Sequence, residues 1–238
     1  MSDAPDSPSY RLDDGVAVIT LDDGKANAIT PDILERLSAL LDRALADDAR
    51  AVVLAGRDGR FSAGFDLATM TSSTEAMQAL VKQGAEFYMK LYGYPLPTIA
   101  ACTGHALAGG AILLLSADHR VGADVPAKIG MNEVAIGMGL PIFAVELARD
   151  RLNPTQFGAA TMAARIYDPA GATAAGYLDR VVPAESVVAE AIADARQLAQ
   201  LKTGAYSLTK RQTRQRSIDY ILATLDDDVA ALGGPTPS

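Results

Sequence analysis

The feature that most constrains the fold of this sequence is a strand-like run that passes through a glycine turn into an apolar helix. The run is PTIAAC at residues 97–102, and TGHALAGGAILLLSAD follows it at 103–118. Leucine is a good helix former, so the second stretch predicts a buried helix. The free N–H groups at the start of a helix favour negative charge. The N–H of Gly109 is therefore a candidate oxyanion donor, although Gly109 and Gly110 are also explained by close packing alone.

A second turn of the same kind lies upstream. The strand-like run AVVLA at residues 51–55 precedes FSAGFDL at 61–67. An oxyanion is stabilised by backbone amides that converge on it, and two such turns can supply one amide each. Taken alone, a Ser-Ala-Gly turn is also common in loops, so the pair of turns carries the argument.

The order and spacing of the two turns resemble those of the crotonase superfamily, also called the enoyl-CoA hydratase/isomerase family. The resemblance covers nearly the whole chain and rests on KANA at 25–28, FSAGFDL at 61–67, GHALAGG at 104–110 and NEVAIG at 132–137. It implies an acyl-CoA thioester substrate and oxyanion donors at the N–H groups of Phe65 and Gly109. It also implies a catalytic role for Glu133.

The resemblance extends to residues expected to bind the substrate. These are Lys25, Ala26, Ala28, Ala63, Asp66, Met70, Gly110 and Lys210. Some of them have ordinary alternatives: Asp66 also suits a turn or helix cap, and Met70 also suits a plain core position. Lys25, with Arg57 and Arg60, is a candidate for the phosphates of coenzyme A, and exposed solvated charges explain these residues equally well.

Glu133 has the most apolar surroundings of any carboxylate in the chain, within IGMNEVAIGMGL at 129–140. Burial raises the pKa of a carboxyl group, which suits a base that works near neutral pH. A helix-capping or ion-paired glutamate is the alternative on the residues alone.

A second catalytic acid distinguishes the hydratases of this family from its isomerases. Enoyl-CoA hydratases carry another glutamate three residues after the oxyanion glycine, and here that position is Ile112. The segment GMNE at 130–133 is also similar to that of isomerases. The resemblance therefore implies a Δ3,Δ2-enoyl-CoA isomerase with Glu133 as the only proton carrier.

Other functions remain open at this point. An enoyl-CoA hydratase would need a second acid, for which Asp66 is the only nearby substitute. A CoA-ester hydrolase or a decarboxylase could use the same oxyanion hole. A non-catalytic acyl-CoA-binding protein with the crotonase fold is the alternative from another class, and the presence of Glu133 argues against it.

The alternation of strands and helices predicts an α/β fold with parallel strands. The main helices are expected from 31 to near 47–48, and near 74–92, 143–151, 154–163, 169–175, 185–201 and 203–224. The resemblance refines this fold to a spiral of ββα turns with a C-terminal helical region that builds trimers. We expect a core with the acyl-CoA site at 1–195, and a helical region with a disordered tail at 196–238.

The composition limits the possible partners. A chain of 238 residues suits one domain, and its net charge of −8 disfavours nucleic acid and anionic membrane surfaces. The sequence has no apolar run long enough to span a membrane, no signal-like segment and one cysteine, Cys102. These features favour a cytoplasmic location.

We expect no metal site, because the two histidines lack ligand-like neighbours. We also expect no cofactor apart from the coenzyme A of the substrate. Apolar positions along the tail, including Val187, Val188, Ala191, Ile192 and Leu198, require a surface to bury them. Together with the resemblance, they predict a homotrimer or hexamer.

Overall fold

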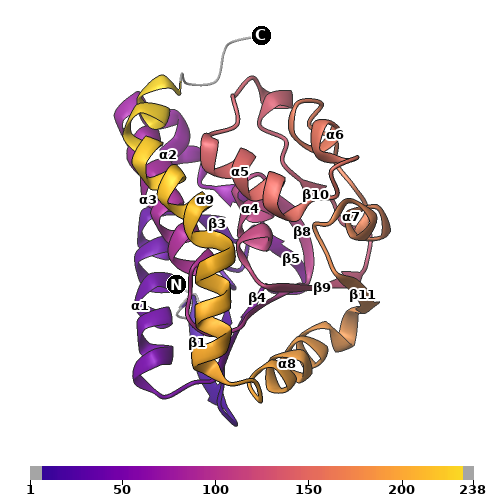
Figure 1. The fold of residues 1–238 in the computed structure, drawn as a ribbon. Helices are drawn as coiled ribbons and strands as arrows, with labels where there is room; N and C mark the ends of the chain where they lie inside the picture. Colours follow the sequence, from indigo (N-terminus) through magenta and orange to yellow (C-terminus); the bar gives the residue numbers. More distant parts are fainter. Residues whose placement is uncertain (1–6, 233–238) are drawn as a thin grey trace, which may run out of the picture.

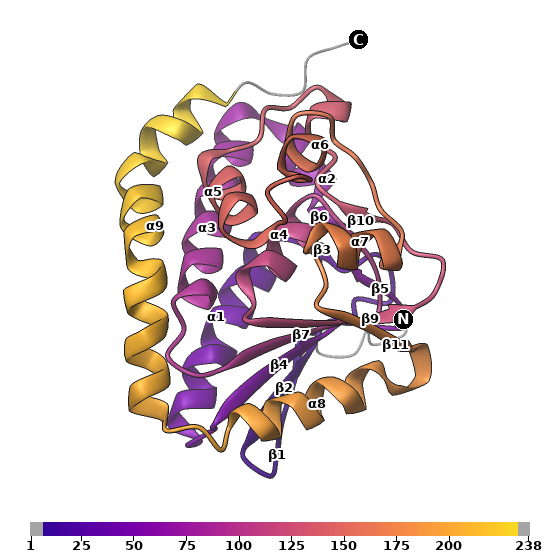
Figure 2. The same cartoon turned by 45° about the vertical axis from the view of Figure 1, so that its right-hand side comes forward.

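The computed structural model describes residues 7–232, and its helices pack around a central sheet (Figure 1). This larger sheet has six strands in the order β1-β2-β4-β7-β9-β11 (Figure 2). Their bounds are β1 (Ser9–Asp13), β2 (Val16–Thr20), β4 (Ala51–Ala55), β7 (Thr98–Cys102), β9 (His119–Asp124) and β11 (Arg180–Pro183). β1 and β2 form an antiparallel hairpin. Each later pair of neighbours is parallel.

Short strands form two smaller sheets. Their bounds are β3 (Ala28–Ile29), β5 (Gly59–Ser62), β6 (Gly64–Phe65), β8 (Gly104–Leu107) and β10 (Ile129–Gly130). One small sheet has the order β10-β8-β5, and the other pairs β3 with β6. The chain repeatedly passes from a strand of the large sheet to a strand of a small sheet and then to a helix. This arrangement confirms the predicted α/β spiral of ββα turns.

Helices cover both faces of the large sheet (Figure 2). Their bounds are α1 (Pro31–Ala46), α2 (Leu67–Ser72), α3 (Thr74–Tyr92), α4 (Gly109–Ser116), α5 (Ile142–Arg151), α6 (Phe157–Thr161), α7 (Pro169–Ala175), α8 (Val187–Leu198) and α9 (Thr203–Ala231), with short 3-10 turns η1 (Val134–Ile136) and η2 (Ala184–Ser186). α1, α3 and α4 lie on one face, and α8 lies on the other. Every residue of α4 is buried, which explains its unbroken apolar sequence.

The two long helices near the N-terminus begin where their capping residues predict. The Ile33 N–H donates to the hydroxyl of Thr30, and the Ala76 N–H donates to that of Ser73, at 3.2 and 3.1 Å. Such side chains satisfy N–H groups that the first turn of a helix leaves unpaired. Local sequence therefore fixes both starting points.

The apolar face of α8 is buried within the chain itself. Val187, Ala191, Ile192 and Ala195 pack on the sheet face that carries residues such as Val53. The chain's own sheet therefore provides the surface that buries these apolar residues of α8. The α8 pattern therefore gives no support for a trimer, and the oligomeric state stays a prediction.

The C-terminal region differs in detail from the expectation. The last helix continues to Ala231, past the expected end at 224 and into the region expected to be a disordered tail. The rest of this expected tail, residues 233–238, lies outside the described part of the chain, as do residues 1–6. The expected division at 195/196 falls inside α8, and the break between α8 and α9 is at 199–202.

Within residues 7–232, no helix is both long enough and apolar enough to cross a membrane.

His119, at the start of β9, joins this strand to two other parts of the fold. Its Nδ1 lies 3.2 Å from Asp179 Oδ2, and its Nε2 lies 3.0 Å from Asp194 Oδ2 on α8. The hydrogen bond with Asp179 raises the pKa of His119, while burial opposes the rise. Arg120 and Arg180 pair with the same two carboxylates. The protonated imidazole, which has two donors, therefore ties α8 to β9.

We expect His119→Gln to remove a pH-dependent part of the stability. A histidine whose folded pKa is raised stabilises the fold below its ordinary pKa, and this contribution is lost as the pH rises through the folded value. The melting temperature of the wild type should therefore exceed that of the variant most at about pH 6 and least at about pH 9. His105→Gln is the control, because burial lowers the pKa of His105 and gives the opposite trend. A constant difference between wild type and His119→Gln across this range would contradict the assignment.

Candidate active site

The first turn leaves the N–H of Phe65 pointing away from its neighbouring strand. Directly after β6, Asp66 N–H donates to Ile29 O of β3 at 2.9 Å, and within β6 Gly64 N–H donates to the Ser62 hydroxyl at 3.1 Å. Successive amides of a strand point to opposite sides. The Phe65 N–H is therefore directed away from β3.

The second turn starts α4 from a strained residue. Ala108 has φ 49° and ψ −123°, a backbone conformation that residues other than glycine rarely adopt. Ala111 N–H and Ile112 N–H both donate to Ala108 O, which fixes the first helical turn. Gly109 is the first residue of the helix, so its N–H has no partner within the helix.

The two turns approach each other so closely that only glycine fits between them. A Cβ atom at position 64 would lie 2.8 Å from the nitrogen of Gly109, and one at position 109 would lie 3.4 Å from the nitrogen of Phe65. A Cβ atom at Gly110 would lie 2.3 Å from Ser62 O, so this glycine lets α4 reach the first turn. The two amides are thus brought into one small region, as two donors to an oxyanion must be.

The 25–28 loop lies beside the first turn. Ala63 N–H donates to Ala26 O at 3.0 Å, and Ala28 pairs with Gly64. Lys25 is exposed on this loop, and its carbonyl accepts a hydrogen bond from Arg57. The structure therefore brings four of the expected substrate-binding residues together beside the first turn: Lys25, Ala26, Ala28 and Ala63.

Asn27 holds this loop in place, a role that the sequence reasoning missed. It is buried with φ 52°, and its side-chain amide donates to Leu21 O, Arg60 O and Phe61 O. Asn is among the few residues that tolerate positive φ, which was the available signal in the sequence.

Glu133 is buried, with 8% of its surface exposed, just before the 3-10 turn η1. Its side chain makes no capping hydrogen bond, and its Oε2 atom has no partner among the described residues. Burial raises the pKa of Glu133 to about 7, opposed by a backbone hydrogen bond. The carboxyl group can therefore gain and lose a proton near neutral pH.

The charge of Glu133 is also felt by Tyr88, whose hydroxyl donates to Gly109 O at 3.0 Å. Glu133 therefore lies within electrostatic reach of a side chain that is hydrogen-bonded to the second turn. Ile112 is buried one turn along this helix. Asp66 caps α2, accepting from Thr69 N–H and the Thr69 hydroxyl at 2.8 Å each, which supports its interpretation as a cap.

The side chains of Phe65 and Met70 pack toward the core. A Cβ atom on Gly84 of α3 would lie 2.3 Å from Phe65 Cζ, so the Phe65 ring sits in a notch that only glycine leaves open. Met70 on α2 is partly buried against the same cluster.

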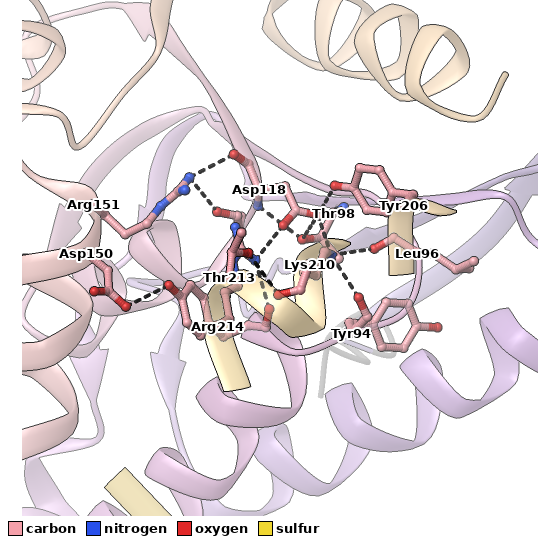
Figure 3. Close-up of polar contacts among 12 residues, drawn as sticks. Tyr94, Leu96, Thr98, Asp118, Asp150, Arg151, Tyr206, Lys210, Thr213 and Arg214 are labelled. Carbon is pink, nitrogen blue, oxygen red and sulfur yellow. Dashed lines mark hydrogen bonds and ion pairs between the residues drawn. The ribbon is translucent and has the colours of Figure 1, made fainter. Parts of the chain in front are cut away.

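Lys210 does not join these residues, which corrects its expected place at the substrate site. Its ammonium group donates to Tyr94 O, Leu96 O and Asp118 Oδ2 at 2.8, 2.8 and 2.6 Å, which uses all three N–H groups (Figure 3). Asp118 Oδ1 also accepts from Arg214 at 2.6 Å. Asp118 thus anchors α9.

This cluster around Asp118 lies at the other end of the sheet from the two turns. Asp118 N–H bonds to Thr98 O, at the amino end of β7, whereas the second turn follows the carboxyl end of that strand. Burial lowers the pKa of Lys210 to about 8, while Asp118 raises it. The buried ammonium and carboxylate therefore serve the attachment of α9.

The residues between 7 and 232 contain no cluster of three or more His, Cys, Asp or Glu side chains arranged to hold a metal ion. Cys102 is buried, and burial raises the pKa of its thiol to about 12. It is therefore an unreactive core residue.

Comparison with known proteins agrees with this geometry. The family model described as enoyl-CoA hydratase/isomerase matches residues 11–231. An enoyl-CoA hydratase/isomerase family protein from Pseudomonas syringae is 45% identical and superposes with a TM-score of 0.91, covering 94% of this chain and 96% of that one. Both activities occur among the names of similar proteins.

Human mitochondrial enoyl-CoA delta isomerase 1 is 30% identical over 219 residues, which are 90% of this chain and 72% of the human protein. A putative enoyl-CoA hydratase of Thermus thermophilus is 35% identical over 208 residues, 82% of this chain and 79% of that protein. The chain belongs to the enoyl-CoA hydratase/isomerase family of the crotonase superfamily, and it is an enzyme of that family.

Proposed function

We propose that this enzyme is a Δ3,Δ2-enoyl-CoA isomerase that uses Glu133 as its only proton carrier. The proposal rests on two observations: the Glu133 carboxyl group is buried with one oxygen unpartnered among the described residues, and the Phe65 and Gly109 amides lie close together. Ile112 stands where a water-orienting acid would be needed, and no neighbouring acid among the described residues contributes to the pKa of Glu133. One carboxylate suffices to move a proton within a substrate.

In the proposed mechanism, the thioester oxygen accepts hydrogen bonds from the Phe65 and Gly109 amides. This polarisation makes the protons at C2 more acidic, and the Glu133 carboxylate removes one of them. The two amides stabilise the negative charge of the dienolate on its oxygen. Glu133 then returns the proton at C4, so that the double bond moves into conjugation with the carbonyl group.

Nothing in this proton transfer calls for a metal or a redox cofactor, and coenzyme A is part of the substrate. We propose that the loop residues Lys25, Ala26 and Ala28, together with Ala63, bind the coenzyme A portion. This proposal is supported by the hydrogen bonds that join this loop to the first turn. The homotrimer or hexamer and the cytoplasmic location stay predictions from the sequence.

The second candidate function is enoyl-CoA hydratase, which the name of the Thermus thermophilus relative favours. Hydration requires a water to be oriented and activated. Asp66 is the nearest acid in the sequence, but its carboxylate already caps α2. We therefore rank hydration second.

The deciding experiment is to incubate the wild type separately with a 3-enoyl-CoA and a 2-enoyl-CoA and to identify the products by chromatography. We expect conversion of the first to the 2-enoyl isomer and slow hydration, or none, of the second. Efficient formation of 3-hydroxyacyl-CoA would establish the hydratase instead.

Glu133→Gln should abolish isomerisation while leaving the affinity for acyl-CoA nearly unchanged. The amide keeps the shape of the carboxyl group but cannot accept the proton. Steady-state rates and equilibrium binding of a saturated acyl-CoA measure the two effects. Glu86→Gln is the control, since Glu86 is exposed on α3. Substantial isomerisation by Glu133→Gln would remove this residue from the mechanism.

The raised pKa of Glu133 predicts opposite effects of pH on activity and on stability. The base must be ionised, so kcat/KM should fall about tenfold per pH unit below its folded pKa of about 7. The unfolded chain ionises this group at lower pH, so the wild type loses stability, up to about 3 kcal/mol, as the pH rises from about 4.5 to about 7.

Glu133→Gln should escape this loss, and its melting temperature should exceed that of the wild type increasingly over the same pH interval. Thermal unfolding at several pH values measures the difference. A difference between the two proteins that does not change with pH would contradict the buried, unpaired state of the carboxyl group.

The contribution of the Gly109 amide can be isolated by comparing two substitutions. Gly109→Ala adds a Cβ atom near the Tyr88 hydroxyl but keeps the N–H, whereas Gly109→Pro adds carbon and also removes the N–H. Loss of one oxyanion donor lowers kcat by about a hundredfold or more. We expect Gly109→Pro to be slower than Gly109→Ala by about that factor. Equal rates in two folded variants would exclude this amide as a donor.

A further inference from the structure

One side chain outside the residues assigned so far contacts both turns and also lies near the base. Tyr88 is on α3 and is fully buried. Its hydroxyl donates to Gly109 O at 3.0 Å, and a Cβ atom at position 109 would lie 2.8 Å from the same oxygen. The hydroxyl is therefore in contact with the residue that carries the second amide.

The ring of Tyr88 also contacts the residue that carries the first amide. Its centroid lies 6.1 Å from that of Phe65 and 5.7 Å from that of Phe143 on α5. Gly84, one helical turn earlier on α3, leaves the notch that receives the Phe65 ring. One face of α3 thus positions Phe65 by packing and Gly109 by a hydrogen bond.

Glu133 lies within electrostatic reach of the same hydroxyl. Burial raises the pKa of Tyr88 well above its ordinary value, and the charge of Glu133 raises it further. Tyr88 therefore stays neutral at physiological pH, and its proton remains available for the bond to Gly109 O.

The start of α4 needs such an outside contact. Ala108 precedes it in a strained conformation, and strained residues persist only where surrounding contacts over-determine them. The first turn of the helix is also free of a side-chain cap. The hydrogen bond from Tyr88 is a tertiary contact that holds this turn against α3.

We propose that Tyr88 is a positioning residue, which holds the Phe65 and Gly109 amides at the spacing that the thioester oxygen requires. It acts through these two residues and has no need to touch the substrate. The inference rests on the proposed function only in so far as both use the same pair of amides.

Tyr94 provides a matched control for the loss of the hydroxyl. It is also buried, and its hydroxyl donates to a helix carbonyl, Leu41 O of α1, at 2.6 Å. Tyr88→Phe and Tyr94→Phe therefore delete the same kind of buried hydrogen bond and keep both rings. A merely structural role would make the two variants behave alike.

The experiment compares wild type, Tyr88→Phe and Tyr94→Phe in three measurements: thermal unfolding, kcat and KM for a 3-enoyl-CoA, and the infrared carbonyl band of bound butyryl-CoA labelled with ¹³C at the thioester carbon. We expect similar losses of stability in both variants. Tyr88→Phe should lower kcat about tenfold at nearly unchanged KM. A tenfold change corresponds to about 1.4 kcal/mol, which is roughly the net contribution of one hydrogen bond. The carbonyl band of Tyr88→Phe should move back toward that of free butyryl-CoA, while Tyr94→Phe keeps the kcat and the band of the wild type.

An unchanged kcat or an unchanged carbonyl band in folded Tyr88→Phe would overturn the inference, as would equal changes in Tyr94→Phe. The carbonyl band requires no turnover, so it separates this inference from the proposed function. If the wild type failed to isomerise its substrate but Tyr88→Phe still shifted the band, the isomerase proposal would fail and the positioning role would stand.

Discussion

The site depends on the parallel pairing of β4 with β7. Their register runs from Val52 opposite Thr98 to Ala55 opposite Ala101, so both strands end at the same edge of the sheet. Each strand then continues into a small-sheet strand and a turn that contributes one backbone amide. In the proposed mechanism these two backbone amides are the oxyanion donors, and the sheet brings them to one edge, where Tyr88 is proposed to hold their spacing.

The same geometry makes the site locally unfavourable for stability. Ala108 is strained, and the Glu133 carboxyl has a buried oxygen without a partner among the described residues. Such costs persist at functional sites when the surrounding structure is stable enough to offset them. Here α4 is buried along its whole length, and Tyr88 adds a hydrogen bond and ring contacts around its first turn.

The opposite end of the sheet attaches the long C-terminal helix α9. Asp118 pairs with Lys210 and Arg214 of α9, and both cations also donate to backbone carbonyls near the end of α3. Breaking one partner of a buried ion cluster is costly, because the other charge is left buried and unpaired. This arrangement fixes the long helix on its own chain, far along β7 from the two amides, and explains why a lysine expected at the substrate is absent from the site.

The sequence by itself determined the features that depend on nearby residues. The capped starts of α1 and α3, the two strand-to-turn segments, the apolar setting of Glu133 and the isoleucine at position 112 were all readable from local pattern. Only the tertiary structure decided which surface buries α8, where the Lys210 ammonium finds its partners, and that Asn27 and Tyr88 support the turns. These outcomes depend on contacts between residues far apart in the chain. The short strands β3, β5, β6 and β8 were not predicted from the sequence for the same reason, since segments of two to four residues become strands only when a neighbouring strand pairs with them.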